Sequence, residues 1–407
     1  MPRITYSIRG AALLVLMSAL AACSSDKIVL TAPPPAAGAL FDSYVALGNS
    51  ITAGYQSGGI NDSTQRESYA VLLANEAGAR FAIPALTEPG CPPPIANFQT
   101  QARFGGGTST TCALRDPSSI TSVINNLAVP GATSADPTAS TSPAANTLTQ
   151  LILGGETQVQ RALEANPTFV SVWIGNNDVL TAAVTGLLTP TSGVSPGVTP
   201  TATFIARYDS MMTALRTAPR LQGGVLVGVV DVTNVPILFP AAALANPQFK
   251  AGFDQFAGQT TTVLANCTNS GSLISFLITA QIRSGAHPAV IGCEKNSVPG
   301  TPVGDIFVLD TAEQTALHAA VAAYNAEISK QASDAGFVYV DPNPALLTLK
   351  QANQIPAVPN LADPVHPFGT YISLDGIHPA KAAHVLIANL IIDAINAKYG
   401  TSIPHAS

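Results

Sequence analysis

Five short apolar segments recur along this chain, and longer segments with helical character separate them. The apolar segments cover residues 44–48, 123–129, 168–175, 223–232 and 337–341. Helices are expected over residues 68–79, 147–165, 311–336 and 379–400. Strands that are apolar throughout are typical of parallel sheets covered on both faces, and their alternation with helices predicts an α/β fold. The sequence therefore predicts a three-layer α/β/α sandwich around a central, mostly parallel five-stranded sheet.

The first 22 residues have the features of an export signal. Arg3 and Arg9 precede an apolar run that is too short to cross a bilayer as an ordinary helix, and small residues follow it. Cys23 comes directly after them, which resembles the bacterial lipobox. That resemblance implies cleavage before Cys23 and a lipid on its sulfur. A plain secretory signal with an incidental cysteine is the alternative.

After residues 1–22, we expect residues 23–40 to form a flexible tether and residues 41–400 to form one domain. Two segments, at about 181–202 and 240–305, look like insertions into that domain, and we interpret them as a lid or cap beside a site. The expected location is the bacterial cell envelope, on the periplasmic or surface side. Ser24 after the cysteine resembles an outer-membrane sorting signal.

Charge narrows the classes of partner. The chain has 18 Lys and Arg against 24 Asp and Glu, a formal net charge of −6, and only 10% charged residues. No basic patch is present in the sequence, so nucleic acid is not an expected partner. We expect a monomer that meets a membrane only through its N-terminal lipid.

The cysteines agree with export. Apart from Cys23 there are four, and four cysteines allow three pairings. Proximity in the sequence favours Cys91–Cys112 and Cys267–Cys293. No CxxC or HxxxH spacing occurs, so no metal site is expected.

Polar residues follow several of the apolar strands. In YVALGNSITAGY (44–55) the strand ends at Gly48 and Ser50 follows, which is consistent with an ordinary turn or with a nucleophilic serine at a strand end. LDGIHP supplies Asp375 and His378, three residues apart, as a carboxylate and a base, although a capped turn explains that spacing equally well.

Two further segments offer donors for an oxyanion. IGNND places Asn177 after the third strand, and NLAVPGAT places Gly131 after the second. By themselves, an Asx-turn and a Pro-Gly turn account for these patterns. We interpret Asp178 as a group that fixes a loop, His384 as a surface residue of the last helix, and His366 as a loop residue.

In combination, GNSITAGY, NLAVPGAT, IGNND and DGIHP resemble the blocks of the GDSL or SGNH hydrolases, in the family's order. The resemblance implies a flavodoxin-like fold and an ester hydrolase without a cofactor. It also implies Ser50 as nucleophile, His378 as base and Asp375 as its orienting acid. The oxyanion hole would comprise the Ser50 N–H, Gly131 and Asn177. Asn49 stands where the family usually has Asp.

The resemblance predicts a cell-envelope serine esterase or lipase that works through an acyl-enzyme. A carbohydrate O-deacetylase and a lysophospholipase or thioesterase are alternatives within the hydrolases. The expected substrate is a small-molecule or lipid ester, and the insertions favour a lipid or acyl substrate because apolar caps can shelter acyl chains. A non-catalytic envelope binding protein on the same fold is the alternative of another class.

Overall fold

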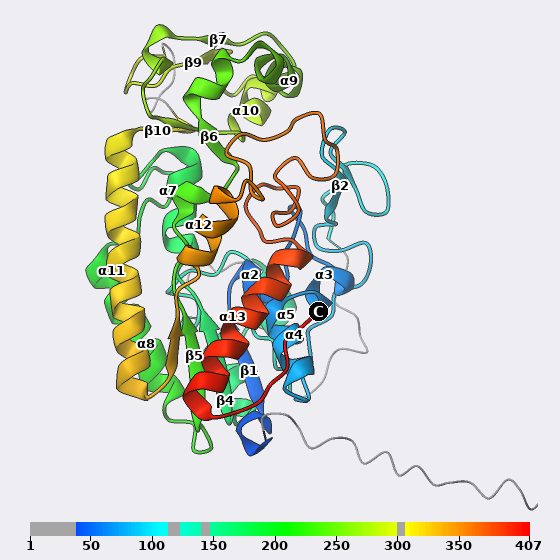
Figure 1. Cartoon of the computed structure of the whole chain (residues 1–407), viewed down its shortest axis with the longest axis vertical. Helices are drawn as coiled ribbons and strands as arrows, with labels where there is room; N and C mark the ends of the chain where they lie inside the picture. Colours follow the sequence, from blue (N-terminus) through cyan, green and yellow to red (C-terminus); the bar gives the residue numbers. More distant parts are fainter. Residues whose placement is uncertain (1–37, 113–122, 140–146, 299–305) are drawn as a thin grey trace, which may run out of the picture. The chain divides into compact units, whose positions relative to one another are not determined.

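The computed structural model describes residues 38–112, 123–139, 147–298 and 306–407 (Figure 1). The predicted signal, Cys23 and the tether up to residue 37 lie outside the described residues. Within the described part, no helix is long and apolar enough to cross a membrane.

The central sheet is parallel, as predicted. It contains β1 (Tyr44–Gly48), β4 (Phe169–Trp173), β5 (Gly223–Val227) and β11 (Val338–Val340), in the order β1-β4-β5-β11. Every residue of β1, β4 and β5 is buried. These strands are apolar throughout because helices cover both faces of the sheet.

The predicted count of five strands was one too high for the described residues. Segment 123–129 runs beside β1 and exchanges backbone hydrogen bonds with Ala46, but the pairing amounts to a single parallel bridge, between Ala46 and Asn126. At the start of the segment the Asn125 side chain, and not a backbone N–H, donates to Tyr44 O at 2.8 Å, and its Oδ1 accepts from Ala82 N at 2.9 Å. Pro130 then ends the segment, because it has no N–H to donate.

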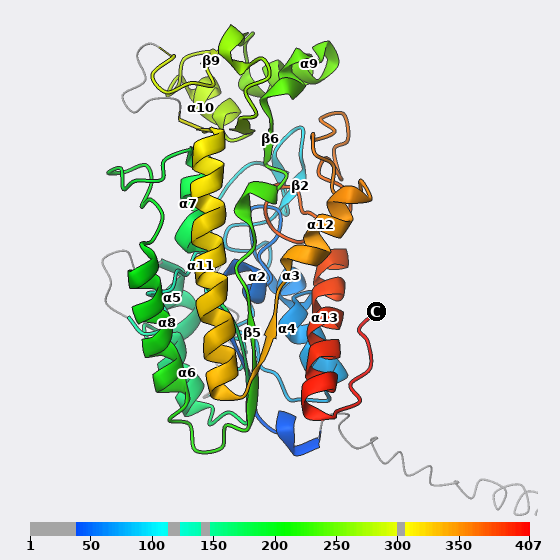
Figure 2. The ribbon, with the colours of Figure 1, turned by 60° about the vertical axis from the view of Figure 1, so that its left-hand side comes forward.

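Helices cover both faces of the sheet (Figure 2), and each face has its own buried cluster of side chains. One face packs against α4 (Tyr69–Glu76) and α13 (Lys381–Tyr399) through alternate strand residues such as Ala46. The other packs against α6 (Gln158–Glu164), α8 (Thr201–Leu215) and α11 (Thr311–Ala335) through residues such as Val45. The three-layer α/β/α arrangement is confirmed.

Helix ends follow the local sequence. Asp310 and Glu313 form a capping box at the start of α11, and Gly336 ends that helix in the left-handed conformation. The helix expected over 147–165 is two helices, α5 (Thr147–Leu153) and α6, because Gly154 and Gly155 both have positive φ between them. A run of two such glycines cannot continue a right-handed helix.

Residues 232–298 and 306–310 form a lobe, here called the cap, that lies beyond the carboxyl ends of the sheet strands (Figure 1). An antiparallel sheet in the order β10-β8-β6 and helices α9 and α10 build it. The bounds are η3 (Val232–Asn234), β6 (Leu238–Pro240), η4 (Ala241–Ala245), α9 (Pro247–Ala257), β7 (Thr262–Val263), η5 (Ala265–Cys267), β8 (Leu273–Ser275), α10 (Ile278–Ser284), β9 (Val290–Ile291) and β10 (Val308–Leu309).

Aromatic rings and a disulfide hold the cap. Phe253, Phe256 and Phe276 pack together inside it, and the ring of Phe98, outside the cap, is tilted against that of Phe256 with their centroids 4.8 Å apart. The cysteine pairs favoured by proximity are both present: Cys267–Cys293 in the cap, and Cys91–Cys112 in the loop region after α4. The contact between Phe98 and Phe256 joins the cap to the sheet domain, and the Cys267–Cys293 disulfide cross-links the cap internally.

Short elements complete the described chain. They are η1 (Gly38–Phe41), α2 (Ser50–Ala53), α3 (Asp62–Arg66), β2 (Ile95–Asn97), β3 (Ala102–Arg103), α7 (Asn177–Thr185) and α12 (Asn343–Gln351).

His384 lies in the core, so its expected position on the surface was wrong. It is fully buried where α13 packs on α4, and its Nδ1 accepts a hydrogen bond from Tyr69 N at 3.2 Å. It therefore satisfies an N–H at the start of α4, next to the Ser68 cap. Burial, with a smaller contribution from nearby His378, lowers the pKa of His384 to about 3.

This burial predicts a pH-dependent stability. Between pH 6.5 and 3 the unfolded chain protonates His384 and the folded chain does not, so the free energy of unfolding falls as the pH drops, by up to about 1.4 kcal/mol per pH unit. In His384→Asn, whose amide oxygen can still accept from Tyr69 N, the loss between pH 7 and 5 should be smaller. Urea unfolding at both pH values measures it, with exposed His405→Asn as control. Equal losses in wild type and His384→Asn would refute the assignment.

Candidate active site

Ser50 is the first residue of the one-turn helix α2, which starts directly after β1. Asn49 caps this helix: its Oδ1 accepts from Ile51 N at 3.1 Å. Gly54 ends it with φ 86°, in the left-handed region that favours glycine. The strand end, the cap and the glycine therefore hold Ser50 at the carboxyl edge of the sheet, where α/β folds bind ligands.

Gly48 is required by packing. A Cβ there would lie 2.2 Å from Thr52 Oγ1, so no larger residue fits between β1 and α2. Asn126 Nδ2 donates to Thr52 O at 2.9 Å, and the Thr52 hydroxyl is 2.9 Å from that of Tyr69. These contacts fix the helix that carries Ser50.

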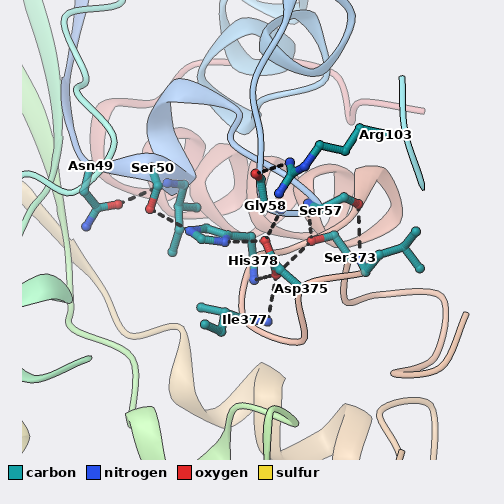
Figure 3. Close-up of polar contacts among 11 residues, drawn as sticks. Asn49, Ser50, Ser57, Gly58, Arg103, Ser373, Asp375, Ile377 and His378 are labelled. Carbon is teal, nitrogen blue, oxygen red and sulfur yellow. Dashed lines mark hydrogen bonds and ion pairs between the residues drawn. The ribbon is translucent and has the colours of Figure 1, made fainter. Parts of the chain in front are cut away.

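Ser50, His378 and Asp375 form a continuous hydrogen-bonded chain (Figure 3). Ser50 Oγ lies 2.9 Å from His378 Nε2, and His378 Nδ1 lies 2.8 Å from Asp375 Oδ2. Ser50 is buried, and the side chains of His378 and Asp375 are each 12% exposed. The structure thus brings together three residues separated by up to 328 positions in the sequence.

Asp375 is held as an anion. Its Oδ1 accepts from the backbone N–H groups of Ile377 and His378, both at 2.9 Å, and from Ser373 Oγ at 3.1 Å. Its Oδ2 also accepts from Gly58 N at 2.7 Å. Burial alone would raise the pKa of Asp375, but His378 and these N–H groups outweigh it and lower the pKa to about 2. A carboxylate with these partners is ionised at neutral pH.

The loop after α2 and the loop before α13 are interlocked beside the triad. Ser57 N donates to Ser373 Oγ at 2.8 Å, and Leu374 N donates to Ser57 Oγ at 3.2 Å. Arg103 braces the same loop by donating to Gly58 O at 3.0 Å (Figure 3). The sequence did not identify Ser57, Ser373 and Arg103 as supporting residues, because their hydrogen-bond partners depend on the fold.

Asn177 lies at the start of α7 and lines the same pocket as Ser50 and His378. Its Nδ2 donates to Ala132 O at 2.9 Å, in the turn that contains Gly131 with φ 84°. Within the described residues, the N–H groups of Ser50 and Gly131 donate to no protein acceptor. Ser50 and Asn177 line the pocket, whereas Gly131 is not among its lining residues and is linked to it through the contact between Asn177 and Ala132.

Two neighbouring side chains fix these loops. Asp178 is buried and accepts from both Ser134 N and Ser134 Oγ, at 2.8 and 2.7 Å. Burial raises the pKa of Asp178, against the effect of those hydrogen bonds. It ties the Gly131 turn to α7. Asn176 Oδ1 accepts from Val230 N at 2.9 Å, which ties α7 to the loop after β5.

Asn49 carries a buried, unused donor. The side chain is fully buried, and among the described residues its Nδ2 has no hydrogen-bond partner. Asn49 stands where the resemblance to the family leads us to expect Asp. Its Oδ1 still caps α2, so the start of the helix is preserved, but the side chain lacks the negative charge that an Asp would place next to Ser50.

The serine opens into an apolar pocket. The pocket has a cavity volume of about 110 Å³, and its polar lining residues are Ser50, His378, Asn176 and Asn177. His366 lies outside it, exposed on a neighbouring groove. Among the described residues, no group of three or more His, Cys, Asp or Glu could hold a metal ion.

Comparisons with known proteins give one family and several similar structures. Residues 44–391 match the sequence model of the GDSL-like lipases and acylhydrolases. A search of curated proteins gives no significant match. Similar solved structures include an extracellular lipase from Streptomyces rimosus, with 15% identity and a TM-score of 0.36, over 86% of this chain and 98% of that chain.

Two more are an acetylxylan esterase mutant and a phospholipase. The esterase is from Geobacillus stearothermophilus, with 13% identity and a TM-score of 0.38, over 89% of this chain and 96% of that one. The phospholipase A1 is from Streptomyces albidoflavus, with 16% identity and a TM-score of 0.34, over 86% of this chain and 98% of that one.

The family match begins at the first residue of β1 and ends within α13, so it includes every strand of the central sheet. It also includes the segments that carry Ser50, Asn177 and His378. The match extends over far more than half of the 407 residues. The chain therefore belongs to the GDSL-like lipase/acylhydrolase family, whose members are ester hydrolases.

Proposed function

We propose that the protein is a serine esterase of the cell envelope, with Ser50, His378 and Asp375 as its catalytic triad. The observation that carries the proposal is the unbroken chain of hydrogen bonds from Ser50 Oγ through the imidazole to the Asp375 carboxylate. A nucleophile, a base and a group that orients the base are what acyl transfer requires.

In the first step, His378 Nε2 accepts the proton of Ser50 as Oγ attacks the ester carbonyl carbon. The Asp375 carboxylate accepts from Nδ1–H, which fixes the tautomer that leaves Nε2 free and stabilises the imidazolium that forms. Tyr55 packs its ring against the imidazole, with centroids 4.9 Å apart, and limits its rotation. These groups act without rearranging, since they are already in contact.

The carbonyl oxygen becomes an oxyanion in this step. The Ser50 N–H, the Gly131 N–H and the Asn177 amide are the groups proposed to bind it. Each such donor is worth about 3 kcal/mol of transition-state stabilisation in enzymes of this type. His378 then protonates the leaving alcohol, and it later activates a water that releases the acid from Ser50.

The envelope location is proposed from the sequence before residue 38. The Arg3 and Arg9 start, the apolar run and the position of Cys23 support it. The two disulfides agree with an oxidising compartment. Metabolic labelling with a radioactive fatty acid tests the anchor: wild type should incorporate label and Cys23→Ala should not.

Replacing Ser50 by Ala removes the nucleophile and nothing else that holds the fold. Hydrolysis of p-nitrophenyl acetate should fall by on the order of 10⁴-fold or more, with an unchanged thermal melting curve. Exposed Ser284→Ala is the matched control and should keep wild-type activity. Wild-type activity in Ser50→Ala would remove the triad assignment and favour a non-catalytic role for this pocket.

Replacing Asp375 by Asn should leave Ser50 in place but lose the charge and disturb the tautomer of His378. In serine proteases the equivalent change lowers kcat by on the order of 10⁴-fold. We expect a loss of that order in kcat at pH 7, where the low pKa of Asp375 keeps the wild-type carboxylate ionised. An Asp375→Asn enzyme within tenfold of wild type would show that another group orients His378.

A further inference from the structure

The pocket at Ser50 continues well past the reacting groups. Ser50 and His378 are in contact in its lining, and apolar side chains from α12, α13 and the loop after β5 make up most of the remaining lining. Leu346 and Leu349 come from α12, and Leu386, Ile387 and Leu390 come from α13. Figures 1 and 2 show α12 near the N-terminal end of α13. This apolar part of the pocket is called the slot below.

Helix α13 has two apolar faces. One is packed into the core through Ala388, Ile391, Ile392 and Ile395, all fully buried. The other carries Leu386, Ile387 and Leu390, which are only half-buried and line the slot. These apolar side chains line a hollow without filling it, so part of their surface is not buried by the protein itself. Burial of that surface by an apolar ligand would be favourable, which is typical of a binding surface rather than of a core.

The length of the slot can be estimated along α13. Ala383, near His378, and Leu390 both line it, and seven residues of helix span about 10 Å. A C–C bond of about 1.52 Å at a tetrahedral angle advances an extended chain by roughly 1.25 Å per methylene. The slot therefore has room for about eight methylene groups.

We propose that the slot binds the acyl chain of the substrate, and that the preferred esters carry medium-length acyl groups of about eight to ten carbons. This inference rests on the proposed function, since it places the acyl carbonyl at Ser50. The absence of Lys, Arg, Asp and Glu from the lining of this pocket fits an alkyl chain and not a sugar. An acetyl group would leave the slot empty.

The experiment is a chain-length series of p-nitrophenyl esters, from acetate to palmitate. In wild type, kcat/KM should rise from acetate to octanoate, by up to about fourfold per added methylene, and stop rising near ten carbons. Leu346→Trp narrows the slot, so the octanoate-to-acetate ratio of kcat/KM should fall at least tenfold.

Leu347→Trp is the matched control, one residue further along α12. Leu347 is 44% exposed and does not line the pocket, so this variant should keep the wild-type ratio. Leu386→Trp tests the slot from the opposite helix and replaces Leu346→Trp if that variant does not fold. Melting curves establish folding for each.

The outcomes separate the two proposals. If hydrolysis depends on Ser50 but is fastest with acetate, the acyl slot is wrong, the esterase proposal stands, and an O-deacetylase is favoured. An unchanged octanoate-to-acetate ratio of kcat/KM in the folded slot variants also overturns the slot and leaves the esterase proposal in place. If no ester is hydrolysed, the proposed function fails, and the slot is then tested separately by measuring decanoate binding with calorimetry. Decanoate should bind wild type and Leu347→Trp with similar affinity, and Leu346→Trp at least tenfold more weakly. Equal affinity for wild type and Leu346→Trp overturns the slot.

Discussion

The arrangement of the site depends on the carboxylate of Asp375. It accepts hydrogen bonds from Ile377, His378 and Ser373 in its own loop and from Gly58 in the loop after α2. One buried anion thus joins the segment that carries the base to the segment that carries the nucleophile. Removing the whole carboxylate would leave several N–H groups buried without an acceptor, which is costly in a low-dielectric site. Both the position and the electrostatics of His378 follow from this group.

The sheet brings the remaining groups to the same place. Ser50 follows β1, Asn177 follows β4, and the pocket-lining Val230 follows β5, so parallel strands deliver all three to one edge. The same geometry leaves a hollow between α12 and α13 next to the serine. The proposed triad and the proposed acyl slot therefore use different side chains of one fold, and the slot can change without altering the triad.

The sequence allowed the parallel sheet, the main helices, the cysteine pairs and the juxtaposition of Ser50, His378 and Asp375 to be predicted, because apolar runs and short family motifs are local signals. Long-range contacts were not accessible. His384 looked like a surface residue because nothing in the sequence shows that α4 covers that side of α13. Segment 123–129 looked like a strand, but it forms only one bridge to β1, and the Asn125 side chain rather than a backbone N–H donates to Tyr44 O. The role of Gly48 likewise depends on the distance to Thr52.

The central claim is that Ser50 is a nucleophile activated by His378 and Asp375. The most direct measurement is labelling of the native protein with a serine-reactive fluorophosphonate, followed by mass spectrometry of the peptides. We predict one phosphonyl group per chain, on Ser50, and a labelling rate that falls sharply in His378→Ala. A folded protein that is not labelled, or is labelled at another residue, would contradict the account.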